Sequence, residues 1–309
     1  MNFDNDQDTF STGWHLNIDT DSIIFAQCCI FNDDSDSDRQ RIARGTRRKV
    51  KELMLDAGCD DYTCFLTTKT NFRDDLVNDY KANRDKVKTP RPINLAWGKR
   101  WCVQNLNTVY QDKLEADDLL GIYDGEKTII WSIDKDLRQI PGKHLDDATR
   151  KVVTITETGV LIDRGKKVYF DGLAGFYFQC LTGDDTDYIV GCGKREPCVY
   201  KTGPNKGQAY IKRKGVGPKL ALKIIVKAAV AGGDPNQNML DAVVEQYKLI
   251  HQKTWQIHLE TQANLLFMVR EKHGCVIRRW TYDGRAEFFD LTQGAILYGY
   301  NPPTAEDSG

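Results

Sequence analysis

Eight carboxylates stand beside apolar segments of the chain, in motifs whose spacing suits metal binding. They are Asp19, Glu115, Asp117, Asp118, Asp134, Asp136, Asp184 and Asp187. Gathered in one place they would repel one another, and taking a carboxylate out of water costs on the order of several kcal/mol, so a cation has to compensate. Oxygen ligands without neighbouring His or Cys favour Mg²⁺ or Mn²⁺ over Zn²⁺. Two such ions about 4 Å apart can hydrolyse a phosphodiester, and we therefore predict a two-ion site.

Each motif taken singly has an ordinary explanation. A DxD pair is commonly a turn, and it also occurs in phosphatases and sugar-nucleotide transferases. The GDDTD stretch around Asp184 fits a helix cap or a calcium loop equally well. The ordered set, a strand-end Asp followed by ExDD, DxD and DxxD, is what favours metal chemistry.

The acidic motifs follow elements that can bring them together. "WHLNIDTDSIIF" predicts a strand that ends near Asp19 and is followed by an apolar helix, and "KTIIWSI" predicts a central strand before Asp134. Strand ends of an open α/β sheet meet at the edge where ligands bind. Two residues apart on a strand, Asp134 and Asp136 point the same way. Three residues apart on a helix, Glu115 and Asp118 share a face.

The remaining pattern predicts an α/β protein with a central, mainly parallel sheet flanked by helices. "RQRIARGTRRKVKELMLDAG" predicts a basic amphipathic helix that ends at Gly58, and "YTCFLTT" predicts a buried strand. The segment 81–113 reads as irregular or loosely helical, crossing above the sheet. "KVVTITETGVLID" predicts a hairpin around 157–159, and two amphipathic helices are expected near 236–252 and 256–273.

The net charge of −1 hides a strong segregation of charge. Residues 1–38 hold nine Asp and no Lys or Arg, residues 39–51 hold seven Lys or Arg and no acid, and residues 194–227 hold ten Lys or Arg against one Glu. Such patches suit an anionic polymer on one surface and cations on another, although solvated charged faces explain them as well. Nine scattered cysteines without CxxC spacing predict reduced thiols.

The chain holds no apolar run of about 18 residues, and its acidic start does not resemble a secretory signal. We therefore expect a cytoplasmic protein without a membrane partner.

A basic stripe follows the glycine-rich turn "GVGPKLA". Lys219, Lys223 and Lys227 recur at four-residue spacing and so share one helix face. Glycines at a helix start let backbone amides approach a phosphate. The stripe predicts a helix hairpin that holds the backbone of a nucleic-acid duplex. The alternative is an ordinary helix hairpin with a solvated face.

Six stretches, in order from residue 15 to about 230, resemble the 5′ nucleases of the flap endonuclease superfamily, especially their phage 5′ to 3′ exonuclease branch. They are "NIDTDSIIF", "DYKANRDK", "LEADDLLG", "SIDKDLRQIPG", "TGDDTDYIVG" and "GVGPKLALKII". The resemblance implies a PIN-like core with a helical arch, and a helix-three-turn-helix subdomain that binds duplex DNA. It also implies a metal-dependent nuclease that engages 5′ ends, nicks or flaps.

The resemblance also assigns roles to residues. The eight carboxylates are the two-metal ligands, and Lys81 and Arg84 contact the scissile phosphate and stabilise its developing charge. Tyr80 stacks on a terminal base or is a core tyrosine. Duplex-binding residues are Gly215, Gly217, Lys219, Lys223, Lys212 and Arg213. The backbone carbonyls of the helix hairpin at the glycine-rich turn are a candidate K⁺ site.

Two stretches depart from the family pattern. The family commonly has another Asp after the second strand, where this chain has Thr67 and Thr68. A threonine cannot supply that charge, so one metal position is expected to be weaker or water-mediated. The basic insertion 192–214, with a hairpin tip at Asn205–Gly207, is either an added DNA-backbone contact or an ordinary surface hairpin.

The expected organisation is an acidic disordered segment at 1–12, a nuclease core at 13–183 with its arch at 81–113, a helix-three-turn-helix region at 184–235 and packing helices at 236–309. We expect a monomer that cleaves 5′ ends, nicks or flaps of duplex DNA, and RNA primers, during replication, in the host cytoplasm if a phage encodes it. The rivals are a structure-selective DNA-binding replication protein with a degenerate metal site and a DxD phosphohydrolase for small esters.

Overall fold

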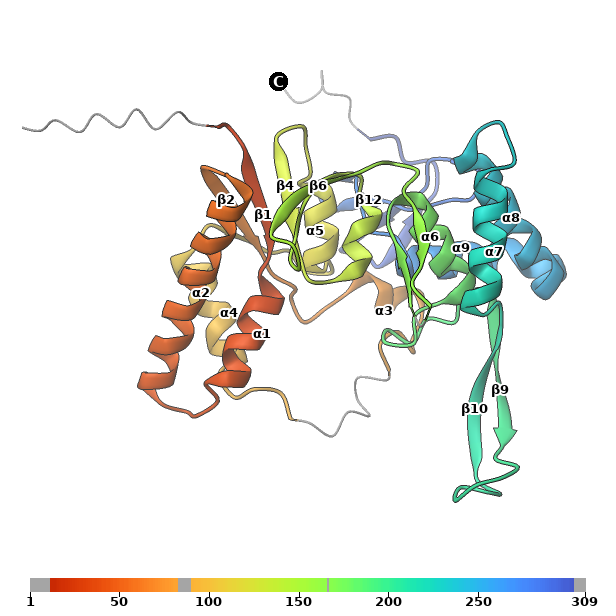
Figure 1. Ribbon diagram of the computed structural model, residues 1–309, viewed down its shortest axis with the longest axis horizontal. Coiled ribbons are helices and arrows are strands. Elements are labelled where there is room, and N and C mark those ends of the chain that lie inside the picture. The colour runs from red at the N-terminus through yellow and green to blue at the C-terminus, as the bar shows by residue number, and fades with distance from the viewer. Residues whose placement is uncertain (1–11, 83–89, 166, 303–309) are drawn as a thin grey trace, which may run out of the picture.

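A six-stranded sheet forms the centre of the molecule. The computed structural model describes residues 12–82, 90–165 and 167–302, and Figure 1 shows their arrangement. The strands run in the order β3-β2-β1-β4-β5-β6, and all neighbours are parallel except the antiparallel pair β5 and β6. They span β1 (His15–Asp19), β2 (Asp61–Phe65), β3 (Thr108–Val109), β4 (Thr128–Trp131), β5 (Gly142–Asp146) and β6 (Lys151–Ile155). This mainly parallel sheet confirms the predicted fold class.

Helices cover both faces of the sheet, as alternation along the strands requires. Ile129 and Trp131 of β4 pack with Leu53 of α2 (Asp36–Ala57), whereas Ile130 packs with Leu119 on the opposite face. The first face also carries α1 (Thr20–Ile30) and α4 (Leu95–Asn105), and the second carries α5 (Ala116–Ile122), with α3 (Phe72–Leu76) beside it. A parallel sheet buried on both sides leaves its strand ends as the accessible edge.

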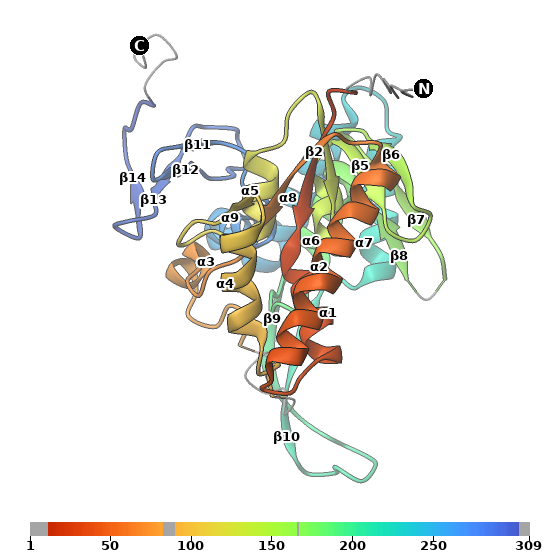
Figure 2. The same ribbon diagram turned by 90° about the vertical axis from the view of Figure 1, so that its left-hand side faces the viewer.

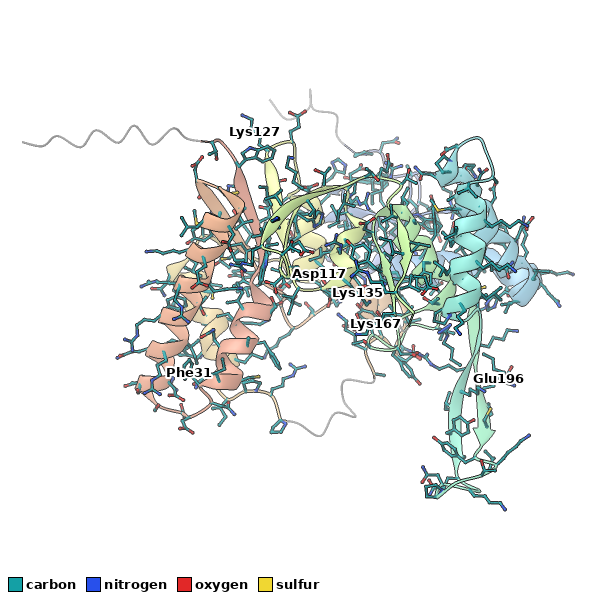
Figure 3. All side chains as sticks on the ribbon, viewed as in Figure 1. Phe31, Asp117, Lys127, Lys135, Lys167 and Glu196 are labelled. Carbon is teal, nitrogen blue, oxygen red and sulfur yellow. The ribbon has the colours of Figure 1, made fainter. Side chains whose placement is uncertain are left out.

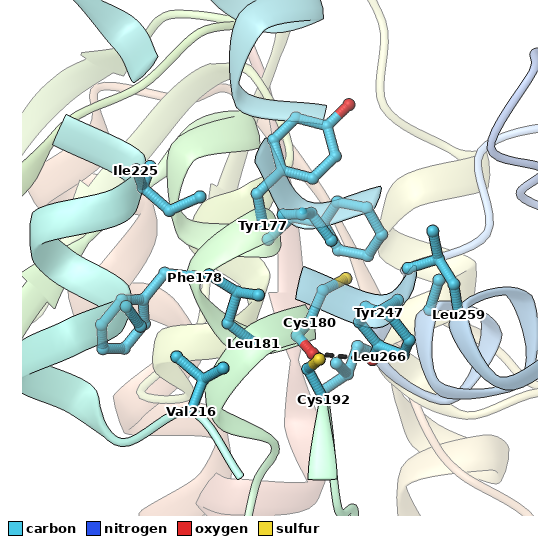
Figure 4. Packing of buried hydrophobic residues seen from close by; sticks show 14 of the residues in the cluster. Tyr177, Phe178, Cys180, Leu181, Cys192, Val216, Ile225, Tyr247, Leu259 and Leu266 are labelled. Carbon is cyan, nitrogen blue, oxygen red and sulfur yellow. Dashed lines mark hydrogen bonds between the residues drawn. The ribbon is translucent and has the colours of Figure 1, made fainter. Parts of the chain in front are cut away.

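A second core lies among four helices of the later half. These are α6 (Gly172–Thr182), α7 (Pro218–Ala229), α8 (Pro235–His251) and α9 (Trp255–Leu266). Figure 4 shows Cys180 and Cys192 packed against Tyr247, whose hydroxyl donates a hydrogen bond of 2.8 Å to the carbonyl oxygen of Cys180. This bond satisfies a polar group inside the apolar cluster.

A two-stranded hairpin projects from the rest of the molecule, as Figures 1 and 2 both show. Its strands are β9 (Gly193–Val199) and β10 (Ala209–Gly215), which pair from Gly193 opposite Gly215 to Val199 opposite Ala209. The rings of Tyr200 and Tyr210 stack at 4.2 Å near its tip. The predicted hairpin in the basic insertion is therefore confirmed, with backbone bonds from Gly207 to Tyr200 at the expected tip.

Several expectations about local structure are corrected. β6 pairs with β5, and β7 (Leu161–Asp163) pairs with β8 (Val168–Phe170), so the segment around 157–159 does not join a β-hairpin. Residues 236–309 hold not only helices but also a four-stranded antiparallel sheet, in the order β11-β12-β13-β14. Its strands are β11 (Lys272–His273), β12 (Val276–Arg278), β13 (Phe288–Asp290) and β14 (Ala295–Leu297).

The described part of the expected arch, 81–82 and 90–113, contains the regular helix α4 and the edge strand β3. Gly98 of α4 lies against Ile24 and Cys28 of α1, so this helix packs on the core. Within the expected helix-three-turn-helix range, 184–235, the described elements are β9, β10, α7 and the start of α8, and the preceding helix α6 ends at Thr182. The expected disorder at 1–12 falls almost wholly outside the described residues.

Among the described residues, no helix combines the length and apolar character needed to cross a membrane.

Candidate active site

The ends of β1 and β4 bring two of the predicted acids to one edge of the sheet. Asp19 ends β1 and accepts a hydrogen bond of 2.8 Å at Oδ2 from the hydroxyl of Ser132, which follows β4. Asp134 caps the 3-10 helix η2 (Lys135–Gln139) and accepts a bond of 2.9 Å from the backbone N–H of Asp136. Asp134 and Asp136 therefore lie on a capped 3-10 turn, which corrects the expectation that they share a strand face.

Five of the predicted carboxylates line one small cavity. They are Glu115, Asp117, Asp134, Asp136 and Asp187, and Arg73, Tyr80 and Lys81 line it with them. Its volume of about 40 Å³ is enough for an ion or a few waters and far too small for a nucleotide. Figure 3 labels Asp117 and Lys135 in this central part of the molecule. The apolar side chains of Ile189, Leu265, Leu266 and Met268 complete the lining, so the site is a cation-sized hollow between the acids and the apolar core.

Asp118 lies outside this lining, because it forms a buried ion pair with Arg73. Nη1 of Arg73 contacts Oδ2 at 2.7 Å and Nη2 contacts Oδ1 at 2.8 Å, and neither side chain is more than 2 % exposed. The carboxylate also accepts the backbone N–H groups of Glu115, in a capping box at the start of α5, and of Val269. With both oxygens accepting hydrogen bonds from protein donors, Asp118 holds α5 to the C-terminal segment, and its role as a metal ligand stays a prediction.

Glu115 is held in its ionised form by cations of the protein. It contacts Lys81 and lies 3.4 Å from Arg73, and the hydroxyl of Tyr80 donates to it at 3.0 Å. Burial alone would raise the pKa of Glu115, but the charges of Lys81 and Arg73 and these hydrogen bonds lower it to about 2. Tyr80 is 8 % exposed, so the structure supports a core tyrosine rather than a base-stacking residue.

Lys81 adopts a strained backbone at the edge of the cavity. Its φ of 56° lies in the left-handed region, and its N–H donates to the carbonyl oxygen of Asp187 at 3.0 Å. Its ammonium lies 3.6 Å from the Asp187 carboxylate and also contacts Glu115. Strain of this kind persists only where surrounding contacts enforce it, and it is common at functional sites. Arg84, its expected partner, lies outside the described residues.

Asp19 and Asp117 are acids whose charge the protein leaves poorly balanced. Burial and the neighbouring charge of Asp21 raise the pKa of Asp19 to about 6. Burial, Asp134 and Asp19 raise the pKa of Asp117 well above its ordinary range. No described residue donates a hydrogen bond to the Asp117 carboxylate. A bound cation would favour the ionised form of both groups.

The donor chemistry of the site fits a hard divalent ion, since every candidate ligand is a carboxylate oxygen. Within residues 12–82, 90–165 and 167–302, however, no three His, Cys, Asp or Glu side chains are close enough to chelate one ion as they stand. Like charges separate unless a cation draws them together. In this structure the carboxylates form ion pairs with cations of the protein, above all with Lys81 and Lys135.

Asp184 and Asp136 share one such cation. Nζ of Lys135 lies 2.6 Å from Oδ1 of Asp136 and 2.9 Å from Oδ2 of Asp184. Burial opposes the charge of Lys135, but the two carboxylates raise its pKa. Burial and Asp134 still raise the pKa of Asp136 to about 6, whereas Lys135 lowers that of Asp184 against the effect of its burial. Asp184 thus joins the group through Lys135 and lies outside the cavity lining.

The threonines that replace the expected acid have structural contacts. The N–H of Thr67 donates to Oδ2 of Asp21 at 2.9 Å, and its hydroxyl accepts the N–H of Ala116 at 2.9 Å. Thr68 donates through its hydroxyl to Thr70 at 3.4 Å. This position therefore links α1 to α5 and supplies no charge to the site.

The basic stripe of α7 lines a separate open groove. Lys219, Lys223 and Lys227 line it together with Leu161 and Asp163 of β7 and with Leu222 and Val226, around a volume of about 490 Å³. The three lysines therefore do share one helix face, as their spacing predicts.

The two glycines before α7 differ in what surrounds them. A Cβ on Gly215 would lie 2.3 Å from the carbonyl oxygen of Cys192, whereas one on Gly217 would meet nothing within 4 Å. Gly215 is thus required for close packing, and Gly217 leaves open space at the N-terminus of α7.

The adjacent β10 residues Lys212 and Arg213 differ in exposure and in their contacts. Lys212 is exposed on β10, directly opposite Glu196. Arg213 is half-buried and donates to the carbonyl oxygen of Val216 at 2.9 Å. Lys212 is therefore exposed to a ligand, whereas the guanidinium of Arg213 contacts the start of α7, and the DNA-binding roles of both residues stay predictions.

Three cations near the acids were not predicted as site residues. Arg73 pairs with Asp118, Lys135 joins Asp136 to Asp184, and Lys99 of α4 contacts Asp21 at 2.5 Å. Lys135 had a visible signal, because a lysine inside a DxD motif is adjacent in sequence to carboxylates that it can pair with. Arg73 and Lys99 are 45 and 78 positions away from the acids they meet, and nothing in their local sequence indicates the contact.

Comparison with known proteins gives one family and several similar structures. Residues 16–165 match the family of the 5′-3′ exonuclease N-terminal resolvase-like domain. Bacteriophage T5 5′-exonuclease with bound zinc is 14 % identical, at a TM-score of 0.46 over 82 % of this chain and 99 % of that one. Bacteriophage T5 flap endonuclease in a complex with DNA and metal ions is also 14 % identical, at a TM-score of 0.45 over 82 % of this chain and 98 % of that one. No curated protein sequence matches the chain.

Proposed function

We propose that this chain is a nuclease of the 5′ nuclease superfamily, which the family match over residues 16–165 supports, and that it hydrolyses phosphodiesters at 5′ ends, nicks or flaps of duplex DNA with the help of a divalent metal ion. RNA primers annealed to DNA are included among its proposed substrates, which suits a role in replication. The observation that carries the proposal is the cation-sized cavity lined by five carboxylates at the edge of a parallel sheet.

The proposed ligands are the acids that the protein's own cations leave least balanced. Asp117 and Asp134 line the cavity, and Asp19 adjoins them, since both Asp19 and Asp134 contribute to the raised pKa of Asp117. Mg²⁺ or Mn²⁺ bound there would supply Lewis acidity to the phosphate and lower the pKa of a water molecule. Glu115 orients Lys81 and Tyr80 through direct contacts.

Lys81 is proposed to stabilise the charge that develops on the phosphate. Its backbone is fixed by the bond to Asp187, and its ammonium lies at the cavity edge between two carboxylates. A cation held at the point where charge develops needs little reorganisation during the reaction. An incoming phosphate would take over contacts that Glu115 and Asp187 now provide. Arg84 is proposed to assist from the adjoining segment.

Duplex DNA is proposed to lie against α7 and the β9–β10 hairpin. The groove that Lys219, Lys223 and Lys227 line attracts phosphates without reading bases. The open space around Gly217 lets a phosphate approach the first amides of α7, where the helix dipole favours an anion. Backbone carbonyls of this turn are the proposed K⁺ ligands. Lys212 extends the basic surface along the hairpin.

A nicked duplex tests the proposal when the 5′ end that lies at the nick carries the label. With Mg²⁺ we expect short labelled products from the wild-type protein, and no products with EDTA or from Asp117→Asn or Asp134→Asn. Both variants should bind the same duplex as tightly as the wild type, because neither residue belongs to the duplex surface. Unchanged turnover in both variants would refute the proposed metal site.

One observation favours a DNA-binding protein with a degenerate site as the second candidate. The position after β2 contributes Thr67 and Thr68 where an acid is expected, and their contacts are structural. This alternative predicts tight binding of nicked or flapped duplexes and no cleavage with either Mg²⁺ or Mn²⁺. The same labelled substrate therefore separates the two candidates.

A further inference from the structure

The far end of the β9–β10 hairpin, residues 200–210, carries a surface that duplex binding at α7 leaves unused. Each strand has seven residues, and at about 3.3 Å per residue they place the hairpin end roughly 20 Å from the base at Gly193 and Gly215. Figures 1 and 2 show the hairpin extending away from α7 and from the rest of the molecule. The hairpin end therefore meets a different part of a bound nucleic acid than α7 does.

Two tyrosines form a stacked pair at the hairpin end. Tyr210 lies directly opposite Cys198, so Tyr200, two residues beyond Cys198, is its diagonal neighbour on the same face of the ribbon. The ring centres lie 4.2 Å apart at an interplanar angle of 26°. Neither ring belongs to a hydrophobic core of the described residues, and Tyr200 is 39 % exposed. Tyr210 thus backs Tyr200 on one side, and a planar ligand can extend the stack on the other.

Backbone hydrogen bonds hold Tyr200 in position. Its N–H donates to the carbonyl oxygen of Gln208 at 3.1 Å, and its carbonyl oxygen accepts the N–H of Gly207 at 2.9 Å. The N–H of Gln208 donates in turn to the carbonyl oxygen of Asn205 at 3.0 Å. A ring that is fixed before a ligand arrives loses little conformational freedom on binding.

The charge of the hairpin suits a chain of phosphates. Residues 194–214 hold seven Lys or Arg and one acid, Glu196, which pairs with Lys214 at 2.5 Å. Three other lysines of the hairpin are exposed, and none of them forms an ion pair with a described residue. They are Lys201, Lys206 and Lys212. Cations beside exposed aromatic rings are the combination that binds single-stranded nucleic acid, because the cations attract phosphates and the rings stack on bases.

We propose that the hairpin end binds unpaired DNA, with one base stacked on Tyr200 and the adjoining phosphates at Lys201 and Lys206. A duplex does not offer this contact, since the faces of its bases are covered by their neighbours in the stack. The site goes beyond the proposed function, because it needs neither a metal ion nor cleavage. It would hold the unpaired strand of a flap or gap while the duplex lies against α7.

Strands with the same phosphates but different bases test the proposal. The wild-type protein is titrated in EDTA into a fluorescein-labelled single strand of about ten thymidines, and into the same strand in which abasic sites replace the thymines. Binding is followed by fluorescence anisotropy. The abasic strand should bind at least about fivefold more weakly, because it has no base to stack on Tyr200. A purely electrostatic surface would bind both strands alike.

Variants of one residue assign the difference to the hairpin end. Tyr200→Leu should bind the thymidine strand as weakly as the wild type binds the abasic strand, and its affinity for the abasic strand should be unchanged. Tyr200→Phe keeps the ring and should keep the preference for the thymidine strand. Tyr298→Leu, which removes a tyrosine that is 88 % exposed outside the hairpin, is the matched control and should bind like the wild type.

A blunt duplex distinguishes a site for unpaired bases from a general loss of binding. Tyr200→Leu should bind this duplex as tightly as the wild type does. Equal weakening of its binding to both single strands and to the duplex would overturn the proposal, as would equal affinity of the wild type for the thymidine and abasic strands. Either result would leave the proposed function standing, since cleavage of the nicked duplex with Mg²⁺ is measured separately. A protein that cleaves nothing but prefers the thymidine strand through Tyr200 would retain this site and lose the proposed function.

Discussion

Removing either partner of the buried Arg73–Asp118 pair should destabilise the protein whether or not metal is present. The pair is bidentate and no more than 2 % exposed, and Arg73 also donates to the carbonyl oxygens of Leu265 and Phe267. Leaving one charge of such a pair unpaired costs about 3–5 kcal/mol. Asp118→Asn should lie near the lower end, because Glu115 remains 3.4 Å from Arg73. Arg73→Met should cost more, since it also frees two carbonyl groups.

Urea unfolding in EDTA measures the loss, and a thermal midpoint lower by about 6 °C or more is expected from a loss of this size. The control is Arg48→Ala, which breaks the exposed pair with Glu52 and should change the free energy of unfolding by about 0.5 kcal/mol or less. If Asp118→Asn lost under about 1 kcal/mol in EDTA but failed to bind Mn²⁺, Asp118 would be a metal ligand and its structural assignment would be refuted.

Three further outcomes are expected. Gly215→Ala should unfold at a lower temperature, because its Cβ would lie 2.3 Å from a carbonyl oxygen, while Gly217→Ala should unfold like the wild type; equal midpoints would contradict the packing argument. Burial and a neighbouring histidine and lysine lower the pKa of His251 to about 4. The stability that its neutral form provides is therefore complete above about pH 6.5 and lost as the pH falls toward 4, and His251→Phe should show a smaller loss in urea unfolding between pH 7 and 5. Lys219→Ala should weaken duplex binding and lower the slope of log affinity against log salt by about one, whereas Lys127→Ala on a remote loop should change neither.

The sheet edge could be predicted because parallel strands end together. Once "HLNID" and "TIIWSI" are taken as neighbouring parallel strands, Asp19 and Asp134 have to follow the same edge of the sheet, and β1 and β4 do pair in parallel, with Ile18 opposite Trp131. The same reasoning fails for α5, where Asp117 and Asp118 are adjacent in sequence. Successive residues of a helix point about 100° apart. One acid reaches the cavity and the other meets Arg73, and no spacing rule indicates which.

The basic hairpin shows the opposite balance of local and long-range information. Its turn residues and strand alternation predict the element and its tip correctly, since a hairpin depends on local sequence. The different roles of Lys212 and Arg213 depend on which face of the hairpin meets α7. That choice is made by contacts beyond the hairpin, so two adjacent basic residues that look equivalent in the sequence differ in their contacts and exposure.

The pairing of acids with cations explains how this fold tolerates its own active site. Asp118 has Arg73, Glu115 has Lys81, Asp21 has Lys99, and Asp136 and Asp184 share Lys135. Each pairing offsets part of the cost of burying a carboxylate. Among the described residues, Asp19, Asp117 and Asp134 have no such partner, and burial together with neighbouring negative charge raises the pKa of Asp19 and Asp117. A protein that neutralises most of its acids internally needs an external cation only where it has left charge unpaired, and we propose that this position is the cavity beside Asp117.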